Sequence, residues 1–404
     1  MQTGTTNHKQ YTLTIILLCI GYFIDFYDLT IFSASYTNIL HDLFNLQDHT
    51  SIQLLYLKIT NCNTAGIIVG GLLFGILGDK FGRTTVIRYS ILLYSLAIIA
   101  SCFTKSIVLF SILRFLSGAG LATEFATSSV LISEMLPQHL AARSTAWLYF
   151  CGILGGITAT FLGMLSWKIM FLCGGGSGLI LFIARKRLFE SPLYLQLPPK
   201  IKRGNIVKMF NKPPNLIKTI KLALLITPFY FVISIMFILP NFMQISAEFA
   251  HLVHILLIGF FIGNLISTLL SNYWVTSLRN FRLFFIVNSL AFFIILNSFS
   301  IVSQLWFFMY AFALGLLGGG LPSIWIQVVA KNYGTNQRNT ATNTLYIIGR
   351  SCSIGFNLLI STWIVNPQNF NYYCIITTLI ITVFSIIAAI RLKDTYGNNI
   401  NYME

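Results

Sequence analysis

Five charged residues lie well inside long apolar segments of the chain. They are Asp25, Asp28, Arg114, Glu124 and Arg350. A charge at the centre of a bilayer costs about 2.5–3.5 kcal/mol on insertion scales, so each of these side chains needs a partner, water or a polar ligand. A carboxyl group in such a place can carry a proton, and a guanidinium offers a fork of donors to a carboxylate. These residue types predict proton transfer and anion binding within a membrane.

The two aspartates belong to the stretch Gly21-Tyr22-Phe23-Ile24-Asp25-Phe26-Tyr27-Asp28. Residues three apart share one face of a helix, and Asp25 lies about 20 Å along its segment, near the middle of a bilayer. Tyr27 stands between them. We expect one acid of this half to pair with Arg114 and another, Asp28 first, to carry a proton. A purely structural pair that bonds to neighbouring helices is the alternative.

Composition identifies the class of protein. The chain has 404 residues, of which 56% are hydrophobic and 9% are charged, with a mean hydropathy of +0.76. Soluble domains average about 25% charged residues, so this composition predicts an integral membrane protein made of helices. Twelve apolar segments are long enough to span, at 12–36, 53–78, 84–103, 107–135, 143–165, 167–184, 219–241, 250–272, 281–300, 303–329, 339–364 and 370–391.

The net charge of +15 is unevenly distributed along the chain. If the N-terminus is cytoplasmic, all but five of the 26 Lys and Arg residues fall on the cytoplasmic side. The five exceptions are Lys58, Lys105, Arg114, Lys168 and Arg350. Positive residues concentrate on the inner side of membrane proteins, so both termini are predicted to be cytoplasmic. The charge therefore indicates orientation and not a nucleic-acid partner.

A short charged turn joins the second and third segments, Gly75-Ile76-Leu77-Gly78-Asp79-Lys80-Phe81-Gly82-Arg83-Thr84. Charges cannot sit in hydrocarbon, so this turn marks a membrane interface. It resembles the loop G-x-x-x-D-R-x-G-R-R between the second and third helices of the major facilitator superfamily. Gly75, Asp79, Gly82 and Arg83 match, while Lys80 keeps a charge that Thr84 loses. The resemblance implies a gating role for these residues; an ordinary basic turn is the alternative.

Further motifs resemble the metabolite:proton symporter branch of that superfamily. They are Asp25-Phe26-Tyr27-Asp28, Arg114-Phe115-Leu116-Ser117-Gly118, Ser133-Glu134-Met135-Leu136-Pro137 and Leu188-Phe189-Glu190-Ser191-Pro192. The resemblance implies that Asp25, Tyr27, Asp28, Arg114 and Glu124 occupy substrate-binding or coupling positions. The chain also departs from the branch, with Ile67-Ile68 where an Arg-Pro pair is common and with Lys331 and Gly334 in place of Glu and Pro.

The predicted architecture is an all-α membrane protein of two pseudo-symmetric six-helix bundles, the major facilitator fold. Residues 1–184 form the first bundle, 185–217 a basic, proline-containing cytoplasmic linker, and 218–404 the second bundle. The turn at 271–282 is a degenerate copy of the charged turn, in which Asn272 replaces the acid. Glycines 315 and 318–320 and Pro322 are predicted to interrupt the tenth segment, and Arg350 is expected to face the centre.

These features predict a secondary active transporter, with proton-coupled uptake of a small polar, carboxylated or zwitterionic solute by alternating access. Efflux of a metabolite, siderophore or drug is the alternative, with a membrane-embedded enzyme or sensor less favoured. We expect no catalytic residues, no cofactor and no metal; His251 and His254 form an HxxH spacing that lacks further ligands. The expected partners are the solute, protons and the lipid bilayer, for a monomer in the bacterial inner membrane.

Overall fold

The computed structural model describes residues 2–44, 49–162, 165–242, 249–274, 278–297, 304–364, 367–392 and 401–403. Within these residues the regular structure is helical. Glu248, Asp394 and Glu404 lie outside the described residues, as do the side chains of His251 and His254.

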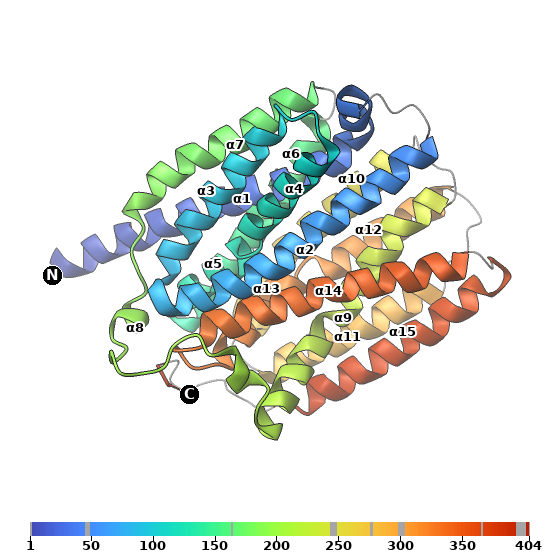
Figure 1. The fold of residues 1–404 in the computed structure, drawn as a ribbon. Coiled ribbons are helices and arrows are strands. Elements are labelled where there is room, and N and C mark those ends of the chain that lie inside the picture. The colour runs from blue at the N-terminus through green and yellow to red at the C-terminus, as the bar shows by residue number, and fades with distance from the viewer. Residues whose placement is uncertain are drawn as a thin grey trace.

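The N-terminal half contains six membrane crossings (Figure 1). Its helices are α1 (Gln2–Phe44), α2 (His49–Phe81), α3 (Arg83–Ser101), α4 (Ile107–Leu121), α5 (Glu124–Met135), α6 (Gln138–Phe161) and α7 (Trp167–Ala184). Here α4 and α5 together make the fourth crossing. Within this half α1 packs on α6, α2 on α4, and α3 on α4 and α7.

The C-terminal half repeats this plan. Its helices are α9 (Pro213–Phe242), α10 (Phe249–Trp274), α11 (Leu278–Asn297), α12 (Gln304–Gly318), α13 (Leu321–Lys331), α14 (Arg338–Ile364) and α15 (Pro367–Ile390). Here α12 and α13 together make the tenth crossing. The pairs α10–α12, α9–α14 and α11–α15 match α2–α4, α1–α6 and α3–α7 of the first half. The halves meet through α2 with α14 and through α6 with α10, which are equivalent pairs under the same pseudo-symmetry.

A linker of short turns connects the halves along one end of the bundle, which we call the linker end (Figure 1). It holds the 3-10 turns η2 (Arg185–Arg187) and η3 (Ile206–Met209) and the single-turn helix α8 (Pro192–Leu195). The seventh crossing begins at Pro213, six residues before the apolar segment from 219. Proline suits the first turn of a helix because its missing N–H would be unpaired there.

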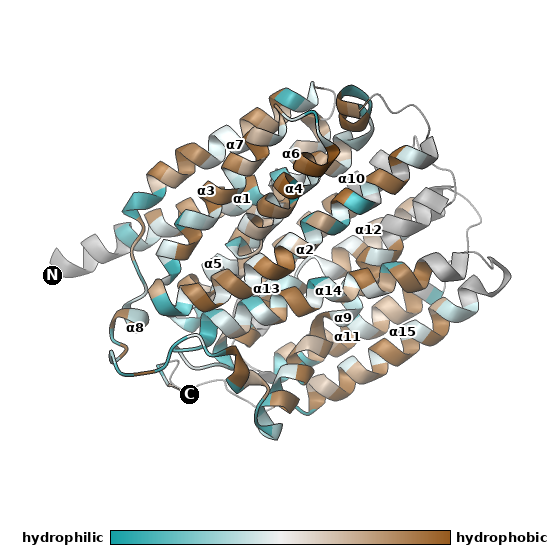
Figure 2. Cartoon of the chain, in the orientation of Figure 1, coloured by the Kyte–Doolittle hydropathy of each residue, from teal (hydrophilic) through white to brown (hydrophobic). Residues whose placement is uncertain are grey.

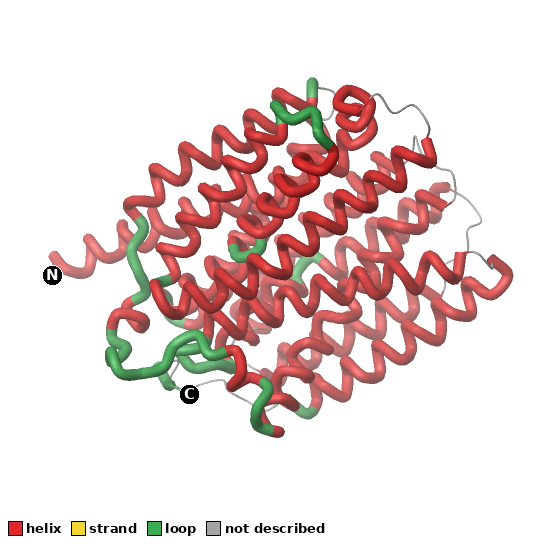
Figure 3. The backbone as a smooth tube through the Cα atoms, in the orientation of Figure 1, coloured by secondary structure: helices red, strands yellow, loops and turns green. Residues whose placement is uncertain are grey.

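Two crossings are broken near their middle, where Figure 3 shows short loop segments inside the bundle. The tenth breaks at Gly319 and Gly320, with Pro322 in the first turn of α13, which confirms the interruption predicted from its glycines. The fourth breaks at Ala122 and Thr123, which the sequence did not predict. Because of this break Glu124 becomes the first residue of α5.

Hydropathy agrees with a membrane protein. Nine helical segments among the described residues, the two broken crossings included, are long and apolar enough to cross a membrane. Hydrophobic residues cover the helices along their lengths, and hydrophilic ones gather at the linker end (Figure 2). The helix α14 is not among the nine, since polar residues such as Asn343 and Arg350 lower its hydropathy.

Close helix crossings depend on paired glycines in both halves. A Cβ atom on Gly70 of α2 would lie 2.2 Å from the carbonyl oxygen of Ala119 on α4, and one on Gly263 of α10 would lie 2.0 Å from that of Leu316 on α12. Small residues let helix backbones approach where lipid offers no hydrophobic driving force. A glycine at the helix crossing therefore allows close packing of α2 on α4 and, equivalently, of α10 on α12.

We expect Gly70→Leu to lower the thermal unfolding temperature of the purified protein by several degrees, because overpacking typically costs about 1–3 kcal/mol. Gly176→Leu is the matched control, since no atom lies within 4 Å of the Cβ position at Gly176. Equal unfolding temperatures for the two variants would contradict this account of the crossing.

Candidate functional site

The charged turn at 75–84 lies at the linker end, where α2 gives way directly to α3. Gly82 joins the two helices with φ of 105°, a conformation that residues with a Cβ rarely adopt. The turn is therefore as short as the sequence predicted. Its charged side chains are then held at the boundary between the two halves.

Asp79 is fully buried and reaches from α2 to the beginning of α14 in the other half. Its carboxylate accepts hydrogen bonds from the backbone N–H of Asn339 (3.2 Å), the backbone N–H of Thr340 (2.8 Å) and the Thr340 hydroxyl (2.7 Å). A carboxylate is favourable at a helix N-terminus because it satisfies free N–H groups and opposes the helix dipole. Asp79 therefore caps α14 across the interface.

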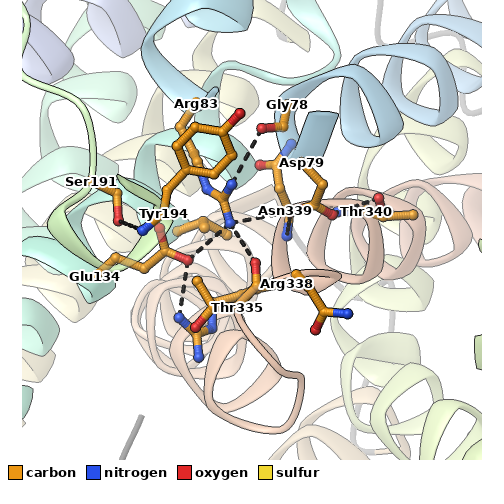
Figure 4. Close-up of polar contacts among 12 residues, drawn as sticks. Gly78, Asp79, Arg83, Glu134, Ser191, Tyr194, Thr335, Arg338, Asn339 and Thr340 are labelled. Atoms are coloured by element: carbon orange, nitrogen blue, oxygen red, sulfur yellow. Dashed lines mark hydrogen bonds and ion pairs between the residues drawn. The ribbon is translucent and has the colours of Figure 1, made fainter. Parts of the chain in front are cut away.

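Glu134 bridges two buried arginines from opposite halves (Figure 4). One oxygen, Oε1, lies 3.1 Å from Arg83 Nη2 and 3.0 Å from Arg338 Nη1. Arg83 also pairs with Asp79 at 3.2 Å and donates to the carbonyl of Thr335 at 2.7 Å. We call Asp79, Arg83, Glu134 and Arg338 the ionic gate, after the gating role that the resemblance predicts for the charged turn. The two acids and two bases of the ionic gate compensate each other out of water.

The linker binds the same turn. Glu190 accepts hydrogen bonds from the backbone N–H (3.1 Å) and hydroxyl (2.9 Å) of Thr84, at the start of α3. The Tyr194 hydroxyl donates to the Lys80 carbonyl at 2.9 Å, and the Tyr194 ring lies 4.6 Å from the Arg83 guanidinium carbon. The Lys80 side chain itself is exposed. The linker thus packs against the turn that supplies Asp79 and Arg83 to the ionic gate.

A second group of charges lies deeper, on α1 and α4. Asp25 and Asp28 are buried, with 2% and 1% of their surface exposed. Among the described residues nothing donates a hydrogen bond to Oδ1 of Asp25 or to either carboxylate oxygen of Asp28. Arg114 lies within electrostatic range of Asp28, and its guanidinium carbon is 4.6 Å from the Phe32 ring centre. This buried group has unused hydrogen-bonding capacity, which a proton or a polar ligand can satisfy.

Glu124 has a partner that the sequence analysis placed in the linker. Arg185, directly after α7, extends inward and forms two hydrogen bonds with the Glu124 carboxylate, one of them 2.9 Å long. It also donates to the carbonyl of Ile87 at 3.1 Å. Only the folding of α7 against α3 and the break before α5 bring these groups together, so spacing along the chain gave no signal of the pair.

Arg350 is half-buried on α14, and it interacts with an acid of the other half. It lies within electrostatic range of Asp25, not Asp28, and of Tyr22, Tyr230 and Tyr346. Its guanidinium carbon is 5.7 Å from the Tyr346 ring centre. Aromatic side chains continue from there across the interface, with Phe125 centred 5.6 Å from Tyr346 and 4.9 Å from Tyr22.

Tyr27 points to a neighbouring helix of its own half. It is buried and its hydroxyl donates to the Met170 carbonyl on α7 at 3.5 Å. A cluster of metal-ligating side chains is not found among the described residues, and the HxxH side chains lie outside them.

Fold and site together define a multi-pass helical membrane protein of two six-helix halves that meet at a buried ionic interface. Comparison with known proteins identifies the family. Residues 18–252, more than half of the chain, match the family model of the Major Facilitator Superfamily, and the chain belongs to it.

Individual relatives are more distant. The chain is 32% identical to the niacin transporter NiaP of Acinetobacter baylyi over 146 residues, and 34% identical to the benzoate transport protein of the same organism over 140 residues. These matches cover 35% and 32% of this chain but only 32% and 30% of those proteins. A putative metabolite transport protein of Haemophilus influenzae is 26% identical over 397 residues, covering 92% of this chain and 93% of that protein.

The fold is shared with solved structures. The proton:xylose symporter XylE superposes with a TM-score of 0.77 at 14% identity, over 98% of each chain. This likeness shows the twelve-span major facilitator fold that the sequence predicted.

We expect Asp79→Asn to lower the thermal unfolding temperature while leaving membrane insertion intact, because an amide cannot neutralise Arg83. Removing one partner of a buried ion pair costs about 3–5 kcal/mol. Asp42→Asn is the control, since Asp42 is exposed and accepts one hydrogen bond, from Trp167 Nε1 at 2.8 Å. An unfolding temperature for Asp79→Asn equal to that of the control would contradict the assigned role of Asp79.

Proposed function

We propose that the protein is a secondary active transporter that takes up a small carboxylated solute together with protons. The observation that carries this proposal is a buried set of charges with unused hydrogen-bonding capacity, Asp25, Asp28 and Arg114, near Arg350 of the other half. Buried ionisable groups inside membrane bundles mark pathways for substrates and protons. Membership of the Major Facilitator Superfamily and similarity to named transporters support the same conclusion.

Alternating access gives these charges a function. The halves are joined at the linker end by the ionic gate, so this structure represents the state closed at that end. Rocking the halves about the central charges would break the ionic gate and open the linker end. The central site, formed by residues of both halves, would then be accessible to the solute alternately from the two sides of the membrane.

The orientation follows from the basic residues at the linker end. With the positive side inward, the linker and both termini are cytoplasmic, and the end that is closed in this structure is the cytoplasmic one. We place the protein as a monomer in the inner membrane of a bacterium. Efflux is the alternative direction of transport. Measuring uptake of solute by intact cells and extrusion of solute from preloaded cells distinguishes the two directions.

Asp28 is proposed as the proton carrier and Arg114 as its counter-ion. When Asp28 is ionised, Arg114 offsets its charge; when Asp28 is protonated, Arg114 loses this counter-charge and can interact with another anion. Proton binding and anion binding are thereby coupled through one guanidinium. Glu124 has a dedicated partner in Arg185, which makes it a less suitable carrier.

We expect Asp28→Asn to abolish proton-driven accumulation of solute while retaining counterflow exchange, because the amide mimics the protonated acid and cannot release a proton. Accumulation and exchange would be measured with labelled solute in proteoliposomes between pH 5 and 8. Counterflow serves as the internal control for folding. Full accumulation by this variant at every pH would exclude Asp28 as the carrier.

Arg350 is proposed to bind the solute carboxylate. A guanidinium stays charged in proteins, so this side chain needs an anion or water when the halves separate. Its aromatic surroundings, Tyr346 and beyond it Phe125 and Tyr22, favour a planar ring on the solute. Niacin and benzoate, named for the transporters to which this chain is similar, are both carboxylates on a six-membered aromatic ring. We therefore propose a small aromatic carboxylate as the first candidate.

We expect Arg350→Lys to weaken binding of nicotinate or benzoate about tenfold or more, because lysine keeps the charge but loses the bidentate fork. Binding would be measured by ligand-induced thermal stabilisation, with nicotinamide and benzamide as neutral counterparts of the same shape. Arg391→Lys, an exposed site at the end of α15, is the control variant. Equal stabilisation by acid and amide, or unchanged binding by Arg350→Lys, would contradict the carboxylate assignment.

A further inference from the structure

Four carboxamide side chains of the C-terminal half cross the interface with the N-terminal half. They are Asn264 on α10, Gln327 on α13, and Asn339 and Asn343 on α14, and each has 0% of its surface exposed. Each donates hydrogen bonds to backbone or hydroxyl oxygens of the other half. These neutral contacts are separate from the acids and bases of the ionic gate.

Asn343 makes the most complete of these contacts. Its Nδ2 donates to the Thr127 hydroxyl at 3.0 Å, and its Oδ1 accepts from the Thr123 hydroxyl at 2.9 Å. Nδ2 also donates to the Asn339 carbonyl within α14 at 2.9 Å. Donor and acceptor of one carboxamide are thus both bound to the region where the fourth crossing is broken.

Asn339 bonds to α2 in the turn that carries Asp79. Its Nδ2 donates to the Gly75 carbonyl at 2.9 Å. A Cβ atom on Gly78 would lie 2.1 Å from the same nitrogen, so glycine is required there for the carboxamide to reach the helix. Gly75 and Gly78 of the charged turn therefore also take part in a contact with an uncharged side chain of the other half.

The other two carboxamides act at the second interface, where α5 and α6 meet the C-terminal half. Gln327 donates to the Thr145 hydroxyl at 2.5 Å and to the Ser129 carbonyl at 3.4 Å. Asn264 donates to the Ala146 carbonyl at 2.9 Å. Both pseudo-symmetric interfaces are thereby joined by carboxamides.

Position along α14 places the contacts of Asn343 between the ionic gate and the central charges. With a rise of about 1.5 Å per residue, Asn343 lies about 8 Å beyond Arg338 and about 10 Å before Arg350. Opening the linker end must break the contacts of Asn343 as well as those of Arg338. Carboxamides have no charge to gain or lose, so this layer holds in either protonation state of the acids.

We propose that Asn264, Gln327, Asn339 and Asn343 form a second, uncharged gate that sets the balance between the states closed and open at the linker end. The inference rests on the proposed alternating-access function and deepens it. In the closed state the nitrogen of each carboxamide donates a hydrogen bond to the other half. In the open state the same groups lie along the path to the linker end, where water and the solute carboxylate replace their partners.

The test compares Asn343→Leu with Asn288→Leu. Asn288 is a buried carboxamide of the same half, but its Nδ2 donates to the Phe284 carbonyl of its own helix at 2.9 Å. Spin labels would be placed at His139 and Arg279, which are exposed residues of opposite halves at the linker end. Pulsed electron paramagnetic resonance would then measure the distance between the halves in the absence of solute. The seven native cysteines would first be replaced.

We expect Asn343→Leu to raise the ratio of open to closed molecules about tenfold, equivalent to about 1.4 kcal/mol and comparable to the net contribution of one or two buried hydrogen bonds. Asn288→Leu should change it less than about twofold by the same measure. Thr127→Val, which removes one partner hydroxyl, is the second variant and should shift the ratio in the same direction.

Unchanged distance distributions in both Asn343→Leu and Thr127→Val would overturn the second gate. So would an equal shift in Asn288→Leu, because the effect would then follow from any buried carboxamide. If Asn343→Leu fails to fold, Thr127→Val alone decides. Since the measurement needs neither solute nor a proton gradient, failure of the transport proposal would appear separately, as a lack of solute binding and uptake by the unmodified protein.

Discussion

The compensation of buried charge at the boundary between the halves is the constraint on which the rest of the structure depends. Arg83 and Arg338 come from opposite halves and share one oxygen of Glu134. Buried ion pairs add little net stability over a well-packed apolar contact, but an uncompensated buried charge is costly. The two halves are therefore held in one arrangement at the linker end, and any other arrangement must supply water to these groups. The ionic gate therefore favours one arrangement of the two halves more than it adds to the stability of the folded protein.

The two interfaces between the halves are equivalent in position and different in chemistry. The α2–α14 interface contains Asp79 and the start of α14, whereas the contact of α6 with α10 uses the Asn264 carboxamide. This asymmetry agrees with the degenerate turn of the second half, where the chain has Asn272 in place of an acid. The first half thus supplies the acids of the interface, Asp79 and Glu134, and the second half supplies Arg338 and the neutral carboxamides.

The central charges differ from the ionic gate in being incompletely satisfied. Every member of the ionic gate has an ion-pair partner, whereas Asp28 lacks a hydrogen-bond donor among the described residues. Low dielectric makes such a group sensitive to any proton or ligand that reaches it. Arg350, with Asp25 across the interface as its acid, connects this sensitivity to the relative position of the halves. In the proposed mechanism, substrate, proton and conformation act on this one set of side chains.

Sequence alone determined the class and the twelve crossings, because hydropathy is a local signal that a bilayer makes decisive. The two repeated halves were predicted from the resemblance of its motifs to a known family. The sequence also located the charged turn, and the buried acids Asp25 and Asp28 could be found from their setting in an apolar segment. The role of each site residue stays a prediction. Tertiary structure alone decided the partners, since Arg185 with Glu124 and Arg338 with Glu134 are distant in the chain. The four carboxamides were not foreseen for the same reason: a neutral amide in an apolar helix carries no signal until the fold shows which oxygen it meets.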